Sequence, residues 1–175
     1  MTKQNSISPK NKIKAYSKLG GNYVFMSCRV FVLLFGCLGH LVYPCFGGFS
    51  NTGLTGLASL EAVKESGLDK ISIGCLSGLS TKIPPVIGKT KAAKKVITID
   101  GCPMECSRKV VEAAGIKITK SIVLTREINM KKTPLNEDLG KDLKPVMQYI
   151  SDEDIRKAKA LIIKSVKEEN PNPCF

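Results

Sequence analysis

The residues best suited to chemistry in this 175-residue chain are cysteines that follow β-like runs. Cys102 and Cys106 lie within VITIDGCPMECSRKVVEAAG, where a β-rich run gives way to a helical run. Two earlier β-like runs, LVYPC and ISIGC, end at Cys45 and Cys75. Three separate runs thus each end in a thiol, and a fourth thiol stands at the start of the last helical run. Such thiols can bind a soft metal, attack a disulfide or simply fill buried space.

The elements that must position these cysteines alternate between β-like and helical runs from residue 40 onward. In the first helical run Leu54, Leu57 and Leu60 recur three apart, and Gly67 is a typical stop signal. The alternation predicts an α/β fold of three layers, with a mostly parallel, Rossmann-like sheet and flanking helices. The expected strands cover residues 40–45, 69–75, 95–102 and 116–127, and the expected helices cover residues 50–67, 80–94, 103–115 and 151–169.

A parallel sheet would bring the four cysteines to one place. The carboxyl ends of its strands line a single edge, and open α/β sheets bind ligands along that edge. We therefore expect a cluster of Cys45, Cys75, Cys102 and Cys106 there. Four thiolates suit a tetrahedral zinc ion at a metal–sulfur distance of about 2.3 Å. The same soft ligands suit an iron–sulfur cluster or copper(I), and for any single cysteine plain burial is the alternative.

The motifs around these cysteines resemble a known family. The segments YPCFGGFSNTG, IGCLSG, IDGCPMECSRKVVEAAGI and SIVLTRE, in this order, resemble the DGC-domain family of proposed zinc-binding proteins, named for the Asp-Gly-Cys motif. The resemblance covers roughly residues 41–130. It implies that the family's shared cysteines correspond to Cys45, Cys75, Cys102 and Cys106. It does not imply a reaction, because the biochemical role of the family is not established.

Two acidic residues stand close to the cysteines in sequence. Asp100, in the motif itself, is a candidate for orienting a metal ligand or accepting N–H bonds in the Cys102 turn, and a plain turn or cap role is the alternative. Glu105 falls early in the expected helix, where the helix dipole stabilises a carboxylate. We expect that simple role for Glu105.

Three functions are compatible with the thiols. A zinc site on all four cysteines would be structural, sensory or a carrier site, and closed four-thiolate sites leave no position for substrate, which favours binding over catalysis. A thiol–disulfide or persulfide redox protein would use Cys106 for attack and Cys102 to resolve the product. An iron–sulfur electron carrier would use the same ligands as zinc. We assign no catalytic residue, and no role to Cys28, Cys37 or Cys174.

The net charge of +12 does not by itself indicate nucleic-acid binding. The first 44 residues carry six of the 27 basic residues and none of the 15 acidic ones, so half of the excess lies in an N-terminal segment. The rest of the chain lacks the interleaved aromatic and basic residues of a nucleic-acid surface. We expect a metal ion as the partner and no nucleic acid.

The N-terminal segment also decides what we expect about compartment. A basic stretch precedes an apolar run at residues 23–43, which is typical of a leader or anchor, although the run is short for a membrane span and Arg29 interrupts it. We expect a cytoplasmic protein, or an anchored or exported one if residues 1–43 are a true leader; a start near Met26 is the alternative. The expected division is an extension at 1–39, an α/β core at 40–130, and a linker with a C-terminal helix at 131–175.

Overall fold

The computed structural model describes residues 14–19, 22–27, 39–46, 53–131 and 149–168. Its strands are β1 (Lys14–Leu19), β2 (Asn22–Ser27), β3 (His40–Pro44), β4 (Ile71–Ile73), β5 (Val96–Asp100) and β6 (Lys120–Val123). Its helices are α2 (Leu54–Ser66), α3 (Leu76–Ser80), α4 (Pro84–Lys91), α5 (Cys106–Ala113), α6 (Leu124–Glu127) and α7 (Asp152–Lys167).

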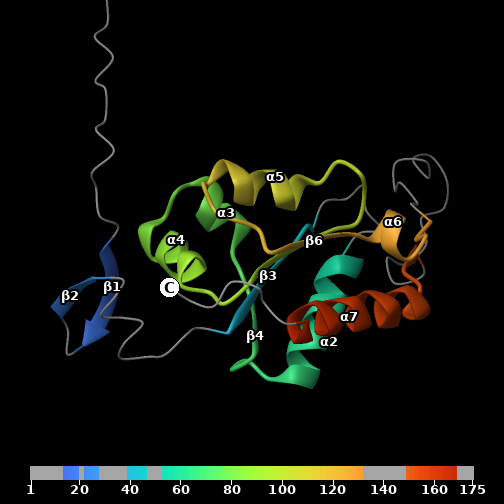
Figure 1. Cartoon of the computed structure of the whole chain (residues 1–175), viewed down its shortest axis with the longest axis horizontal. Helices are drawn as coiled ribbons and strands as arrows, with labels where there is room; N and C mark the ends of the chain where they lie inside the picture. Colours follow the sequence, from blue (N-terminus) through green and yellow to red (C-terminus); the bar gives the residue numbers. More distant parts are fainter. Residues whose placement is uncertain (1–13, 20–21, 28–38, 47–52, 132–148, 169–175) are drawn as a thin grey trace, which may run out of the picture.

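Four strands form the central sheet, in the order β4-β3-β5-β6 (Figure 1). All neighbouring pairs are parallel. The register places Tyr43 beside Thr98, and Thr98 beside Ser121. The predicted parallel α/β sheet is therefore confirmed, and all of its carboxyl ends lie at one edge.

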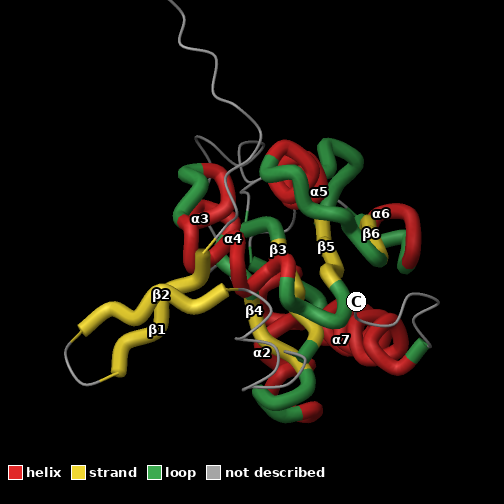
Figure 2. Tube along the Cα trace, turned by 60° about the vertical axis from the view of Figure 1, so that its left-hand side comes forward, coloured by secondary structure: helices red, strands yellow, loops and turns green. Residues whose placement is uncertain are grey.

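Helices cover both faces of this sheet. Figures 1 and 2 show α2 and α7 on one side of the strands and α3, α4 and α5 on the other. Each face has its own apolar cluster: Val42 and Ile97 belong to the cluster with α2 and α7, whereas Leu41 and Val96 belong to the cluster with the other helices. Alternate residues of one strand thus enter different clusters, as the two-residue period of a strand requires. The predicted three-layer fold is confirmed.

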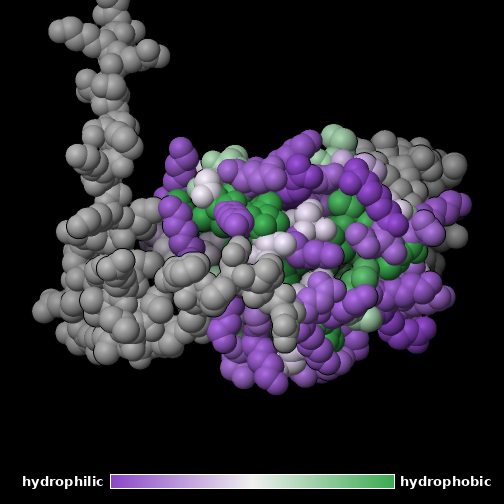
Figure 3. Space-filling model, in the orientation of Figure 1, coloured by the Kyte–Doolittle hydropathy of each residue, from purple (hydrophilic) through white to green (hydrophobic). Residues whose placement is uncertain are grey.

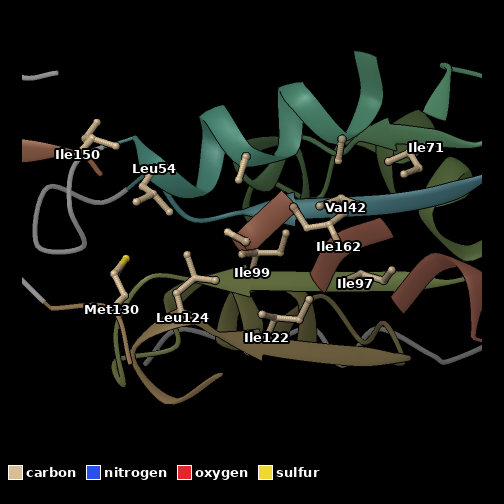
Figure 4. Packing of buried hydrophobic residues seen from close by; sticks show 13 residues of the cluster. Val42, Leu54, Ile71, Ile97, Ile99, Ile122, Leu124, Met130, Ile150 and Ile162 are labelled. Atoms are coloured by element: carbon tan, nitrogen blue, oxygen red, sulfur yellow. The ribbon is translucent and has the colours of Figure 1, made fainter. Parts of the chain in front are cut away.

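The larger cluster lies between the sheet and the pair α2 and α7 (Figure 4). Ile97 and Ile99 of β5 and Ile162 of α7 are fully buried in it. Burying one such side chain contributes about 1.5–3 kcal/mol relative to leaving it in water. The five consecutive buried residues of β5 reflect a central strand that is covered on both faces.

Helix α5 begins later than the sequence predicts. The sequence indicates a helix from Pro103, whereas α5 begins at Cys106. The reason is Glu105, whose φ of 52° lies in the left-handed region and cannot continue a right-handed helix backwards toward Pro103.

The predicted strand region 116–127 also divides differently. Only Lys120–Val123 forms a strand, and α6 follows at once. Val123 pairs with Asp100, which is the last residue of β5, so the chain beyond Val123 has no neighbouring strand to pair with. Leu124 instead turns into the core, where it is fully buried.

Before residue 40, β1 and β2 pair antiparallel, a pairing that the sequence analysis does not anticipate. Much of the apolar run of the N-terminal segment falls on residues 28–38, outside the described residues, as do Cys28, Cys37 and Cys174. None of the helices in the described ranges combines the length and apolar character needed to cross a membrane.

Helix α7 is fixed at both of its ends. At its start, the Ser151 hydroxyl accepts the N–H of Asp154 at 3.3 Å and caps the first turn. At its end, the Lys95 ammonium donates to the carbonyls of Ser165 and Val166, both at 3.0 Å, and to that of Glu168. Lys95 is only 4 % exposed. A buried cation thus satisfies carbonyls that have no partner within the helix. Figure 3 shows that the face of the molecule where α2 and α7 lie in Figure 1 is mainly hydrophilic.

Replacing Lys95 by Met should release the last turn of α7. Hydrogen bonds from a charged donor contribute about 1.5–3 kcal/mol each, partly offset by the cost of burying the ammonium, so we expect a net loss of about 2 kcal/mol in the free energy of unfolding. Chemical denaturation measures this loss, and hydrogen exchange should localise the faster opening to residues 164–168. Lys117→Met, at an exposed position, is the matched control. Equal stabilities of Lys95→Met and wild type would contradict this role.

Candidate functional site

The carboxyl edge of the sheet contains a topological switch point. The chain passes from β3 to β4 on one side of β3, and then returns to β5 on the other side. Ligands of open α/β sheets bind at the carboxyl ends of the strands where the strand order reverses in this way. Cys45 directly follows β3, and Cys102 comes two residues after β5. These two cysteines therefore flank the position where such a fold places its site.

Cys45 is held by both neighbouring elements. Its N–H donates to the carbonyl of Ile99 at 2.8 Å, which continues the pairing of β3 with β5. Its carbonyl accepts the hydroxyl of Thr55, a buried residue of α2. Its thiol is hydrogen-bonded to the Asp100 carboxylate. The backbone and side chain of Cys45 are thus ordered, and the side chain is partly accessible.

Cys75 is exposed and caps the short helix α3. Its sulfur accepts the N–H of Gly78 at 3.3 Å and lies 3.5 Å from the Ser77 hydroxyl oxygen. These contacts, the hydroxyl first, lower the pKa of the Cys75 thiol because they stabilise the anionic thiolate. The residue before Cys75 is Gly74. A Cβ at this position would lie 2.2 Å from the buried Tyr43 ring, so a larger residue would clash there.

Tyr43 supports the loop that carries Cys75. Its hydroxyl lies 2.5 Å from the Thr90 hydroxyl of α4, so one side chain ties β3 to α4 beneath Gly74. Burial raises the pKa of Tyr43, and the nearby charge of Cys75 acts in the same direction, opposed by the Thr90 hydrogen bond. The phenol is therefore a neutral, fixed support.

Cys102 and Cys106 end up in different environments, although they are close in sequence. Cys102 is buried, with 6 % of its surface exposed, and its carbonyl accepts the N–H of Glu105 at 3.3 Å. Cys106 is the first residue of α5 and is exposed. A turn rather than a helix therefore separates the two thiols.

Asp100 fixes the N-terminus of α5. One carboxylate oxygen accepts the N–H of Ser107 at 2.8 Å, and the other accepts the N–H of Arg108 at 3.2 Å. Ser107 adds a second bond to the sheet, from its hydroxyl to the Tyr43 carbonyl at 2.5 Å. The motif aspartate thus acts as a helix cap that comes from a strand, and it also contacts Cys45. The cap role is therefore present, and the role of Asp100 in orienting a metal ligand stays a prediction.

Glu105 is a residue whose role the sequence does not reveal. It is buried, and its carboxylate pairs with Arg108 at 2.6 Å and with Arg126 of α6 at 3.0 Å. Glu105 is the N-cap residue of α5, in a left-handed conformation, so it remains at the end of the helix where the dipole favours an acid. A positive φ can be anticipated from sequence where Gly, Asn or Asp occurs, because these residues adopt it most readily, but not at a glutamate.

The four candidate ligands share the carboxyl edge but are not gathered around one point. Within the described ranges, no three histidine, cysteine, aspartate or glutamate side chains are arranged so that they could hold a metal ion together. None of these four cysteines forms a disulfide within the part of the chain that the structure describes. The assignment of Cys45, Cys75, Cys102 and Cys106 as metal ligands therefore stays a prediction.

Removal of the Asp100 carboxylate should destabilise the protein. Asp100→Ala leaves the N–H groups of Ser107 and Arg108 without their acceptor, at an expected cost of about 1–3 kcal/mol in the free energy of unfolding. Thermal and chemical denaturation measure this cost, with the exposed Asp69→Asn as control. A cost below that of the control variant would contradict the capping role.

The pH dependence of the same site has a definite sign. Burial raises the pKa of Asp100 above its ordinary value of 3.8, although the bonds from Ser107, Arg108 and Cys45 oppose the shift. The folded state therefore holds this proton more tightly than the unfolded chain, so the contribution of the group is most favourable at low pH and declines as pH rises through the raised pKa. The free energy of unfolding of Asp100→Asn should therefore increase relative to that of wild type as pH rises over that interval.

Comparisons with known proteins agree with this architecture at the level of the family. The family model for the DGC domain matches residues 41–164, which includes all four central strands and most of α7. The chain is similar to the anaerobic and virulence modulator AnvM of Pseudomonas aeruginosa, with 24 % identity over 102 residues, covering 58 % of this chain and 71 % of that protein. No solved structure matches. Because the family model spans well over half of the sequence, the chain belongs to the DGC-domain family.

Proposed function

We propose that this chain is a zinc-binding protein whose metal ligands are Cys45, Cys75, Cys102 and Cys106. The observation that carries the proposal is the position of the thiols at the ends of three adjacent strands, β4, β3 and β5, around the switch point. Adjacent strands lie about 4.8 Å apart. Tetrahedral zinc with metal–sulfur bonds of about 2.3 Å needs sulfur atoms about 3.8 Å apart. The spacing of the strand ends is therefore compatible with such a site.

The donor chemistry suits zinc, but the thiols must move to share one ion. The Cys45 thiol is bonded to Asp100, and the Cys75 sulfur accepts the Gly78 N–H. Cys102 is buried while Cys106 is exposed. Metal binding commonly orders its own ligands and releases their protons. We therefore expect side-chain rotation at the strand ends on binding, with Asp100 keeping the N-terminus of α5 in place.

A closed four-thiolate site would cross-link the loops after β3, β4 and β5. Bound zinc would supply structural stabilisation there, since no coordination position is left for water or substrate. Asp100 would then contribute by holding Ser107 and Arg108, which fixes the helix that begins at Cys106. This arrangement supports a binding role more than a catalytic one.

Thiol exchange is the second candidate, and one observation favours it. Cys75 is exposed, and its pKa is lowered by the Ser77 hydroxyl and the Gly78 N–H. A stabilised, accessible thiolate is the reactive form in disulfide exchange. The pair that the sequence suggests, Cys106 for attack and Cys102 for resolution, has one accessible and one buried member.

Metal analysis of the full chain separates these functions. We expect about one zinc per chain, lost when any one of the four ligands is changed to Ser, because a tetrahedral site needs four donors. Cys174→Ser is the matched control and should keep the metal. A brown protein that contains iron and sulfide would indicate an iron–sulfur cluster, rather than zinc, on the same ligands. Protein without metal, with a reversible Cys102–Cys106 disulfide, would overturn the metal proposal in favour of redox chemistry.

The reactivity of Cys75 is a separate prediction. In metal-free protein near neutral pH, we expect iodoacetamide to modify Cys75 faster than Cys102, because its thiolate is stabilised and exposed. Ser77→Ala should slow the reaction at neutral pH, and the difference should vanish well above the ordinary thiol value of 9.0. Mass spectrometry of tryptic peptides gives each rate. Unchanged reactivity in Ser77→Ala would contradict the assigned cause.

A further inference from the structure

Glu105 lies between two of the candidate ligands and combines three unusual properties. It is a charged residue with only 8 % of its surface exposed. Its φ of 52° is a conformation that costs free energy for any residue with a Cβ. No Gly, Asn or Asp occupies the position, although these residues adopt this conformation most readily. Contacts of the glutamate itself must therefore compensate for the strain.

Both carboxylate oxygens of Glu105 are engaged by arginines from different elements. Oε2 pairs with Arg108 of α5 at 2.6 Å, and Oε1 pairs with Arg126 of α6 at 3.0 Å. Arg108 is itself held from the other side by Glu112, at 3.0 Å from its Nε. The carboxylate thus joins the turn after β5 to the helix after β6. Removing a partner from a buried charge leaves that charge uncompensated, and this costs more than breaking an ion pair whose two members are both exposed.

The backbone of Glu105 passes this constraint to the neighbouring thiols. Its N–H donates to the Cys102 carbonyl at 3.3 Å, and its carbonyl accepts the N–H of Lys109 at 3.0 Å. The left-handed residue closes the turn on one side and opens α5 on the other. The turn that Glu105 closes thus separates a buried thiol, Cys102, from an exposed one, Cys106.

We propose that Glu105, held by Arg108 and Arg126, is a positioning residue that fixes the backbone of the Cys102–Cys106 turn, so that only the cysteine side chains need to rotate when a metal binds. We call these three residues the Glu105 latch. The consequence for metal affinity rests on the proposed zinc function, whereas the consequence for thiol exposure does not. Arg126 is not a candidate ligand and pairs with Glu105 from a different helix, so we expect its effect on the site to pass through Glu105.

The first experiment measures thiol exposure in the metal-free, full-length chain. Wild type, Glu105→Gln and Arg126→Gln are treated with iodoacetamide under native conditions, and the modification of each cysteine is followed by mass spectrometry. We expect Cys102 to react about tenfold faster in Glu105→Gln, since loss of the charge leaves both arginine contacts weakened. The rise should be smaller in Arg126→Gln, because Arg126 is largely exposed.

Two control variants make the result specific. Arg126→Lys keeps the charge and should retain most of the protection of Cys102. Lys157→Gln removes a surface pair with Glu153, at 2.7 Å and outside the site, and should change nothing. Rates at Cys45 and Cys75 should stay within about twofold of wild type, because other contacts hold those loops. An unchanged Cys102 rate in Glu105→Gln, or an equal rise at all four cysteines, would overturn the proposal.

The variant Glu105→Gly distinguishes the effect of the ion pairs on the turn from the effect of the left-handed backbone conformation. Glycine adopts the left-handed conformation without strain but offers no carboxylate. The latch predicts that Cys102 becomes reactive in this variant too, despite the more favourable backbone. If glycine protects Cys102 as well as glutamate does, the ion pairs are not what holds the turn, and the proposal fails.

The second experiment tests the consequence for the metal. Zinc affinity is measured by competition with a chromogenic chelator for wild type, Glu105→Gln and Arg126→Lys. We expect at least about tenfold weaker binding in Glu105→Gln and near-normal binding in Arg126→Lys, since a misplaced turn must be reordered before it can bind. Equal affinities would overturn the link to metal binding. If the wild-type protein binds no zinc, the proposed function is refuted. The alkylation rates alone then test the Glu105 latch.

Discussion

The buried carboxylate of Asp100 is the interaction on which the carboxyl edge of the sheet depends. It ends the central strand β5, accepts two N–H groups at the start of α5 and contacts the Cys45 thiol. A helix N-terminus has several N–H groups without internal partners, and burying them without an acceptor would be costly. In satisfying two of them, Asp100 ties the first turn of α5 to the end of the central strand. The cost of burying this charge appears in its raised pKa.

Two acidic residues thus hold the same short turn through different contacts. Asp100 acts from the sheet, through backbone N–H groups, and Glu105 acts through arginine side chains of α5 and α6. The turn between them carries Cys102 and leads into Cys106. Where metal ligands are few and lie on loops, such supporting contacts decide how precisely the ligands are placed. The carboxyl edge therefore has ordered supports even though its four thiols are not gathered in the described conformation.

The neighbouring strands contribute to the same edge by different means. At β3, Thr55 and Ile99 hold the backbone of Cys45. At β4, the ring of Tyr43 lies against Gly74, and the Ser77 and Gly78 groups stabilise the sulfur of Cys75. Cys75 is thus the thiol with the clearest electrostatic activation, and Cys102 is the most enclosed. The proposed metal site and the proposed thiol exchange differ in whether all four cysteines are needed.

Much of this architecture follows from local sequence patterns. Runs of β-branched residues alternating with helical runs specify the parallel sheet, because both faces of each strand need covering and the crossovers are helices. The spacing of cysteines after those runs then puts them at one edge. The cap of α7 by Ser151 is equally local, since donor and acceptor lie within one turn. Tertiary structure alone decided the later start of α5, the end of β6 at Val123, the burial of Lys95 under α7 and the role of Glu105. Each of these depends on a partner that is distant in sequence or on a strained backbone angle, and neither leaves a pattern in neighbouring residues.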